Sequence, residues 1–315
     1  KKYYIDYLKL AASYENNCSV DKVTDTQIES MLDRLAKNYD GYCFDEDYEK
    51  KVFSTWSVNT FFQTMVGKKK VQFGEYWYDN GGLPSILVNY LKTHELNIFE
   101  YLDKDKFLKV SSDDFKNPTA LTTINQNVLM CQTGYLTLRS DLNKTSTVAL
   151  GIPNGEIYKA LNRLLANNIF KGNTDITDDY GRSLLEVGTV DDIINLFNSA
   201  LNSVSYDNYP IVSESSVQNM LKLYLLGAHQ KVLSEVHEAK GRADLVVNTD
   251  NRRIVFEFKY AKNETEAKSK LLDAVEQIKT RDYGNIVPNK TELLRIAAVF
   301  NADPKVRAFT EFQLV

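Results

Sequence analysis

The sequence has few of the residues that cross-link or break a chain. Only three of its 315 residues are cysteine, and Cys18, Cys43 and Cys131 lie in no CxxC or Cys/His pattern. An odd, scattered set excludes a disulfide framework and indicates no zinc site, so we expect buried thiols in a reducing, cytoplasmic setting. Fourteen glycines and six prolines are too few for a fibrous or low-complexity protein.

Long apolar runs are also missing. No stretch reaches the roughly 20 apolar residues that a helix needs to cross a bilayer. The first ten residues, KKYYIDYLKL, lack the apolar centre of a signal peptide. We therefore expect a soluble protein with no membrane partner. With 43% hydrophobic and 25% charged residues, the chain has the composition of a globular protein, and its length suits two domains.

The formal net charge of −4 is unevenly distributed. Residues 213–315 contain 16 Lys and Arg against 14 Asp and Glu, a net charge of +2, which leaves −6 for residues 1–212. This asymmetry gives mild support for contact between the C-terminal part and nucleic acid.

The first two thirds of the chain predict mainly helices. In TDTQIESMLDRLAKNYDG, apolar residues recur at helical spacing, Thr24 or Thr26 is a candidate N-cap, and Asp40-Gly41 breaks the pattern. Ser54 is a candidate cap for STWSVNTFFQTMVGKKK. Further helices are predicted in GLPSILVNYLK, NQNVLMCQ, NGEIYKALNRLLANN and SLLEVGTVDDIINLFNSALNSV, the last with Thr189 or Asp191 as its cap.

Two short strands interrupt this helical part. They are predicted around residues 135–139 and 147–152, between two helices, which would suit a small winged-helix-like unit. The stretch YDNYPIV, residues 206–212, has the turn chemistry of a domain boundary. We therefore expect one domain over residues 1–206 and another over 207–315.

The second domain predicts the order helix, strand, strand, strand, helix, strand. Its first helix is capped by Ser213 and followed by Gly227 at the C′ position. A strand in HQKVLSEVHEAKG and a hairpin come next. An amphipathic helix in TEAKSKLLDAVEQIKTRDYG closes at Gly284, and LLRIAAVF has the pattern of a strand buried on both faces.

The hairpin, GRADLVVNTDNRRIVFEFK, contains ionic residues among apolar ones. Ionic side chains on a half-buried sheet must be paired, bound to a ligand or functional. A two-residue turn at Asp250-Asn251 places Asp244 directly opposite Glu257, with Cβ atoms about 4.5 to 5.5 Å apart. Lys259, two residues further along, shares their face of the sheet.

This arrangement favours a magnesium site. Two carboxylates so close together repel each other unless a cation neutralises them. Magnesium prefers oxygen ligands and accepts one or two carboxylates, with water and phosphate oxygens as the rest. Beside it, Lys259 could orient or deprotonate the attacking water or stabilise charge on a phosphate. The alternative is that Glu257 and Lys259 merely solvate an exposed sheet face, but the facing Asp244 and the preceding Gly-Arg argue against it.

These residues resemble the PD-(D/E)XK nuclease superfamily, with Ala243 in the place of the motif's proline. The segments GRADLVV, IVFEFKY and AVEQIKTRDYG are similar to the nuclease-like module at the C-terminus of a bacterial family of AAA-ATPase-like proteins. The resemblance implies a restriction-endonuclease-like fold for residues 207–315. It also implies that Glu214 on the first helix and Gln277 on the later helix complete the site.

The resemblance extends to NYDGYCF, STWSVNTFF, YWYDNGG, CQTGYLTL and GIPNGEIY in the first domain. These segments are similar to the helical region that follows the ATPase core in the same family. No GxxxxGK[ST] motif occurs in the chain, so ATP hydrolysis by these residues is not expected. The chain resembles either a portion that lacks the P-loop part, with an ATPase portion or partner protein outside this sequence, or a member that never had one.

The expected function is hydrolysis of phosphodiester bonds in DNA with Mg²⁺ or Mn²⁺ as cofactor. Asp244 and Glu257 would hold the metal, Lys259 would be the activating group, and Glu214 and Gln277 would assist. Arg242 is a candidate phosphate contact or a rim salt bridge. Two alternatives stay open: an inactive nuclease-like module that binds nucleic acid or protein, and a mainly helical interaction protein in which the C-terminal domain is scaffold.

Overall fold

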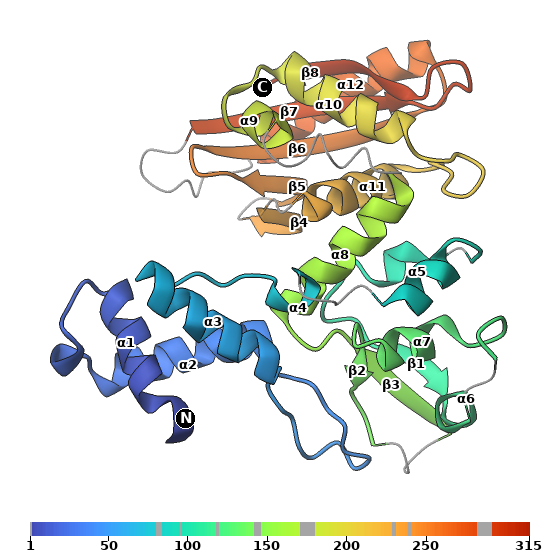
Figure 1. The fold of residues 1–315 in the computed structure, drawn as a ribbon. Helices are drawn as coiled ribbons and strands as arrows, with labels where there is room; N and C mark the ends of the chain where they lie inside the picture. The colour runs from blue at the N-terminus through green and yellow to red at the C-terminus, as the bar shows by residue number, and fades with distance from the viewer. Residues whose placement is uncertain are drawn as a thin grey trace. The chain divides into compact units, whose positions relative to one another are not determined.

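The computed structural model describes residues 2–79, 84–94, 96–117, 120–141, 146–170, 180–228, 231–238, 241–281 and 292–315. The chain divides into two compact units, Lys1–Leu161 and Asn162–Val315 (Figure 1). The first is mainly helical and the second is built around a mixed sheet, so the mixed α and β class is confirmed. Over these described ranges, no helix is both long and apolar enough to cross a membrane.

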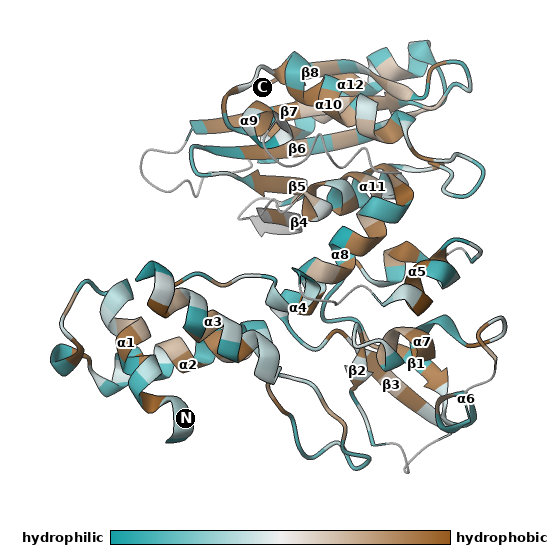
Figure 2. Cartoon of the chain, viewed as in Figure 1, coloured by the Kyte–Doolittle hydropathy of each residue, from teal (hydrophilic) through white to brown (hydrophobic). Residues whose placement is uncertain are grey.

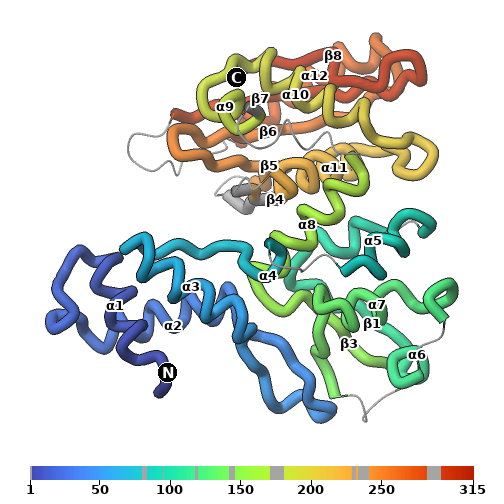
Figure 3. The backbone as a smooth tube through the Cα atoms, viewed as in Figure 1, coloured from blue at the N-terminus to red at the C-terminus, as the bar shows by residue number. Residues whose placement is uncertain are grey.

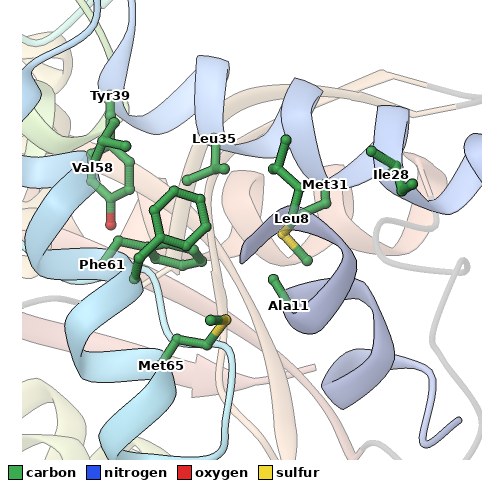
Figure 4. Packing of buried hydrophobic residues seen from close by; sticks show 10 residues of the cluster. Leu8, Ala11, Ile28, Met31, Leu35, Tyr39, Val58, Phe61 and Met65 are labelled. Carbon is green, nitrogen blue, oxygen red and sulfur yellow. The ribbon is translucent and has the colours of Figure 1, made fainter. Parts of the chain in front are cut away.

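The first unit begins with three helices packed on one another: α1 (Ile5–Glu15), α2 (Asp25–Tyr39) and α3 (Thr55–Lys68). Thr24 caps α2 with a capping box, and Ser54 caps α3, so both predicted caps are confirmed. Apolar side chains from the three helices point toward one another to form the core (Figure 4). They include Leu8, Ala11, Ile28, Met31, Leu35, Tyr39, Val58, Phe61 and Met65.

The rest of the first unit contains a small antiparallel sheet with accompanying helices. Its strands are β1 (Leu108–Ser111), β2 (Thr137–Leu138) and β3 (Thr147–Gly151), in the order β1-β3-β2. The predicted strand pair is confirmed, whereas β1 was missed because it is only four residues long and contains an exposed lysine. The accompanying helices are α4 (Tyr76–Asp79), α5 (Ser85–Leu91), α6 (Ser112–Lys116) and α7 (Gln126–Gln132). A winged-helix-like identity stays a prediction.

A buried carboxyl group links three helices of this unit. Glu156 stands in the first turn of α8 (Gly155–Ile169) and is 1% exposed. Its Oε2 accepts a hydrogen bond from Ser57 Oγ at 2.6 Å, and its Oε1 accepts one from the Trp77 amide at 2.9 Å. Burial raises the pKa of Glu156 to about 7.

The three cysteines are free, as expected. Cys43 is buried, but Cys18 and Cys131 are only partly buried, so the prediction of three buried thiols is confirmed for one of them. Burial nevertheless raises the pKa of Cys131 to about 12. A thiol with so high a pKa is a poor nucleophile near neutral pH.

The second unit contains a five-stranded sheet in the order β4-β5-β6-β7-β8. Strands β6 and β7 are parallel and the other neighbours are antiparallel. The strands are β4 (Lys231–Glu238), β5 (Gly241–Asn248), β6 (Arg252–Ala261), β7 (Glu292–Asn301) and β8 (Ala308–Leu314), and the helices are α9 (Tyr180–Val187), α10 (Val190–Asn202), α11 (Glu214–Gly227) and α12 (Glu264–Arg281).

The predicted order of elements from α11 to β7 is confirmed, and β8 is an additional edge strand that was missed. Strand β7 is buried along most of its length, as its apolar run indicated. The helix stop predicted at Gly284 and the turn predicted at Gly81-Gly82 lie outside the described residues.

Helices cover both faces of this sheet. On one face, Ala274, Val275 and Ile278 of α12 pack against strand residues that include Val246 and Val255. On the other face, Phe197 of α10 contacts Phe256, with ring centroids 5.3 Å apart. Figure 2 shows hydrophobic residues along β5, β6 and β7, the strands between these layers. By the alternation of strand side chains, Glu257 and Lys259 share the α12 face with Val255.

The second compact unit begins earlier than the predicted domain 207–315. The Arg252 guanidinium donates a hydrogen bond to the Gly188 carbonyl at 2.6 Å. Asn198 on α10 exchanges two hydrogen bonds with the backbone of Phe309, at 3.1 and 2.8 Å. Helices α9 and α10 are thus held by the C-terminal sheet, and the turn residues 206–212 connect two helices inside one unit. Turn chemistry marks a loop in either situation.

Two further helix predictions need correction. The segment 183–204, predicted as one helix, is divided at Gly188 into α9 and α10, and Thr189 caps α10. Gly227 is the last residue of α11 and not its C′ residue. A Cβ atom on Gly227 would lie 2.3 Å from Cβ of Ala166 on α8, so glycine permits a close helix crossing there.

Gly227→Ala is expected to lower the free energy of unfolding by about 1 to 3 kcal/mol, because the new methyl group overlaps Ala166. The matched control is Gly67→Ala in α3, where no atom lies within 4 Å of the added Cβ. That change should raise the free energy of unfolding by about 1 kcal/mol through helix propensity. Urea denaturation measures both, and equal effects of the two changes would contradict the steric account.

Candidate active site

A tight turn sets the register of β5 and β6. The Thr249 amide donates to the Arg252 carbonyl at 2.9 Å, and Thr249 Oγ1 accepts from the Arg252 amide at 2.9 Å. Residues Asp250 and Asn251 are the two turn residues, as predicted. The register runs from Asn248 opposite Arg253 to Leu245 opposite Phe256, which confirms the predicted alignment over these pairs.

At Asp244 a side chain continues the ladder in place of the backbone. The described pairing of β5 with β6 ends at Leu245 opposite Phe256. Beyond this pair, the amide of Phe258, two residues further along β6, donates a hydrogen bond to Asp244 Oδ2 at 2.8 Å. The carboxylate is thereby fixed beside β6 at the point where the two backbones stop pairing. The expected direct pairing of Asp244 with Glu257 is replaced by this side-chain contact.

Lys259 joins two further carboxylates. Its Nζ donates a hydrogen bond to Glu257 Oε1 at 2.7 Å and lies 3.7 Å from Glu214 Oε2. Glu257 is fully buried, whereas Glu214 keeps 39% of its side chain exposed. Glu214 begins α11 after its cap Ser213, where a negative charge is favoured by the helix dipole. Four of the five predicted site residues therefore gather at the sheet.

The local electrostatics are dominated by burial and by negative charge. Burial, followed by the charge of Asp244, raises the pKa of Glu257 to about 7. Burial likewise raises the pKa of Asp244, although the Phe258 amide opposes this. Burial lowers the pKa of Lys259, but the hydrogen bond and charge of Glu257, with Glu214 and Asp244, outweigh it and raise the pKa above its usual value.

Gln218 is a site residue that the sequence analysis missed. Its side-chain amide lowers the pKa of the Asp244 carboxyl, against the larger effect of burial. Gln218 lies one helical turn after Glu214 on α11, so the two side chains share a helix face. The i, i+4 spacing of Glu214 and Gln218 was the available signal.

Gln277, the fifth predicted residue, lies on α12 with its side chain partly buried. It precedes Ile278, which packs on the same sheet face that holds Glu257 and Lys259. This places Gln277 on the appropriate helix and layer. Its participation in the site stays a prediction, and so does phosphate contact by Arg242, which is exposed on β5.

The residues present fit a divalent cation. Glu257 Oε2 is buried and has no hydrogen-bond partner among the described residues, so one carboxylate oxygen is left for a ligand. Glu257 and Glu214 lie within 4 Å of the Lys259 amine and the charge of Asp244 also acts on it, so the site has an excess of negative charge. Within the described part of the chain, no group of three or more His, Cys, Asp or Glu side chains is placed to hold a metal ion, so protein ligands of these types would number at most two. Two carboxylates with water and phosphate oxygens match magnesium better than zinc.

The titration of Glu257 tests this arrangement. In the metal-free protein, its carboxyl should titrate near pH 7, and Asp244→Asn should lower that pKa by removing a neighbouring negative charge. Lys259→Met should raise it, because the hydrogen bond and positive charge are lost. Carboxyl ¹³C NMR measures these shifts. Glu264, an exposed partner of Lys268 on α12, serves as the internal control and should not respond to either change.

Comparison with known proteins gives a match, and it covers the part of the chain that contains these site residues. A search of curated proteins finds no match to this sequence. A family model described as the PD-(D/E)XK nuclease superfamily matches residues 212–310. The matched segment contains Glu214, Gln218, Asp244, Glu257 and Lys259, which the geometry brings together, and Gln277. In residues 212–310, this chain therefore matches the PD-(D/E)XK nuclease superfamily.

Proposed function

We propose that the protein is a metal-dependent nuclease that hydrolyses phosphodiester bonds of DNA, with Mg²⁺ or Mn²⁺ held by Asp244 and Glu257. The observation that carries the proposal is the buried, unpartnered Oε2 of Glu257 beside Asp244 and Lys259. A buried carboxylate oxygen without a partner is costly unless a ligand or proton satisfies it. The superfamily match supports nuclease activity in general.

Each side chain has a distinct role in this proposal. Asp244 is positioned by the Phe258 amide and by Gln218, so its carboxylate is oriented before any ligand arrives. Lys259 presents an ammonium group where the negative charge of a phosphate would develop. Glu214 holds that ammonium group from the helix side. Gln277 is proposed as an auxiliary ligand or water-orienting group from α12.

The metal would supply positive charge that offsets the two carboxylates and lowers the pKa of a water molecule. The protein contributes a buried acid, Glu257, a partly buried acid, Asp244, and a neighbouring amine. Lys259 occupies Glu257 Oε1, so a cation bound through the unpartnered Oε2 would lie close to the ammonium group. A competing amine is therefore part of the same site.

The wider context is proposed from resemblance alone. The chain would belong to a bacterial AAA-ATPase-like family, either as a portion without the P-loop part or as a member that never had one. An ATPase portion or partner protein would act with it in the cytoplasm. Residues 1–206 would be the helical region of that family, and residues 207–315 the nuclease-like domain.

Metal binding separates this proposal from a pure binding module. Titration calorimetry of the full chain with Mn²⁺ should detect one site, and Asp244→Asn and Glu257→Gln should each weaken binding about tenfold or more. Lys259→Met should bind Mn²⁺ at least as tightly as the unchanged protein, because a competing cation is removed from Glu257. No uptake of Mn²⁺ by the unchanged protein would favour the inactive, binding or regulatory alternative.

Cleavage tests the assignment of chemistry. Asp244→Asn and Lys259→Met should each reduce Mg²⁺-dependent cleavage of DNA by about 100-fold or more. The first change removes a charge that would hold the metal, and the second removes the positive charge beside the phosphate. Lys268→Met is the matched control, since Lys268 forms an exposed pair with Glu264 on α12. Gel analysis of labelled DNA gives the rates. Retention of full activity in Lys259→Met, with Lys268→Met equally active, would refute the role of Lys259.

A further inference from the structure

A hollow lies in the C-terminal unit, beside the end of β7. Its volume is about 160 Å³. The connection from α10 to α11 meets the end of β7 and the turn before β8 there (Figure 3). The described residues that line it are Leu201, Asn202, Val204, Tyr206, Tyr209, Ile211, Phe300, Ala302 and Arg307.

Arg307 gives this hollow its chemistry. Its guanidinium carbon lies 3.4 Å from the centre of the Tyr206 ring, so the two planar groups are stacked. Its Nε atom is buried and has no hydrogen-bond partner among the described residues. The acid in the same turn is engaged elsewhere, because Asp303 Oδ1 accepts a hydrogen bond from the Lys305 amide at 2.9 Å. Arg307 Nε is therefore a hydrogen-bond donor that no described residue uses, on a side chain stacked on the Tyr206 ring.

The backbone of Arg307 is strained. Its φ of 44° lies in the left-handed region, which a non-glycine residue adopts at a cost of about 1 kcal/mol or more. Glycine would adopt this conformation without strain. The strained residue is thus the one whose side chain stacks on Tyr206.

The hollow lies close to the proposed active site along β6 and β7. Lys259 is followed by Tyr260, whose ring stacks with Phe300 at a centroid distance of 6.5 Å. From Glu257 to the end of β6 at Ala261 the strand advances by roughly 13 Å at its usual rise per residue. That is about the length of four stacked nucleotides. A single strand passing over this end of the sheet could reach both places.

We propose that this hollow binds an unpaired nucleobase of single-stranded nucleic acid, with the base stacked beside the Arg307–Tyr206 pair. The inference rests on the proposed function, since it assigns a substrate feature to that nuclease. Unstacked bases bind on aromatic rings and on guanidinium planes, as this lining offers. Substrates with a single-stranded end or flap would therefore be preferred over blunt duplexes.

Binding without divalent metal tests the pocket separately from cleavage. Fluorescence anisotropy of the full chain in EDTA would compare a labelled single strand of about 12 thymidines with a blunt duplex. Arg307→Gly removes the guanidinium and also the backbone strain, so it should fold at least as well. It should weaken single-strand binding about tenfold, as expected for loss of one stacked base, and leave duplex binding unchanged.

Two further variants sharpen the test. Tyr206→Leu should weaken single-strand binding similarly, because it removes the stacking partner from a side chain that is already 41% exposed. Lys305→Ala removes a positive charge from the same turn and should change binding by less than about twofold. Unchanged binding in Arg307→Gly, or an equal loss in Lys305→Ala, would overturn the pocket assignment. Single-strand binding that depends on Arg307 in a protein without metal-dependent cleavage would instead refute the nuclease and keep the pocket.

Discussion

The hydrogen bond from the Phe258 amide to the Asp244 carboxylate is the contact on which the site depends. It lies where the backbone pairing between β5 and β6 stops. There the Asp244 carboxylate, and not a backbone carbonyl, accepts the hydrogen bond from β6. This contact holds an acid against a strand that carries Glu257 and Lys259 on its buried face. An ordinary continuation of the ladder would pair the backbones fully and leave no carboxylate fixed at this point.

Burial of the negative charges of Asp244 and Glu257 costs free energy, and the surrounding hydrogen bonds offset this cost only in part. The Glu257 side chain has no exposed surface, and its single described hydrogen bond is to Lys259. Gln218 and the Phe258 amide stabilise the charged form of Asp244, but burial has the larger effect on its pKa. Such incomplete compensation is typical of functional sites, where ionisable groups are kept poised.

Much of the second unit was predictable because its sequence signals are local. A two-residue turn with polar residues fixes the register of a hairpin, and this register correctly aligned β5 with β6. The caps Thr24, Ser54, Thr189 and Ser213 were also predictable from the short range of capping interactions. The gathering of Glu214, Asp244, Glu257 and Lys259 followed from register together with family resemblance.

What escaped prediction depends on contacts between distant segments. Gln218 was missed because its partner, Asp244, lies on another element. Gly227 was assigned to a helix stop because its need for a small side chain arises from Ala166 on α8. The placement of α9 and α10 with the sheet depends on long-range bonds such as that between Asn198 and Phe309. Periodicity and turn chemistry contain no information about such partners.

Glu156 has a consequence for how the first unit responds to its surroundings. Its carboxyl is buried in that unit, and the folded-state pKa of about 7 exceeds the roughly 4.3 of an unfolded chain. The neutral form is therefore the one that folding favours. Its contribution to stability is complete in acid below the unfolded value and disappears as the solution passes neutrality toward alkali. Mild alkalinity, more than mild acid, is the condition that loosens the junction of α3, α4 and α8.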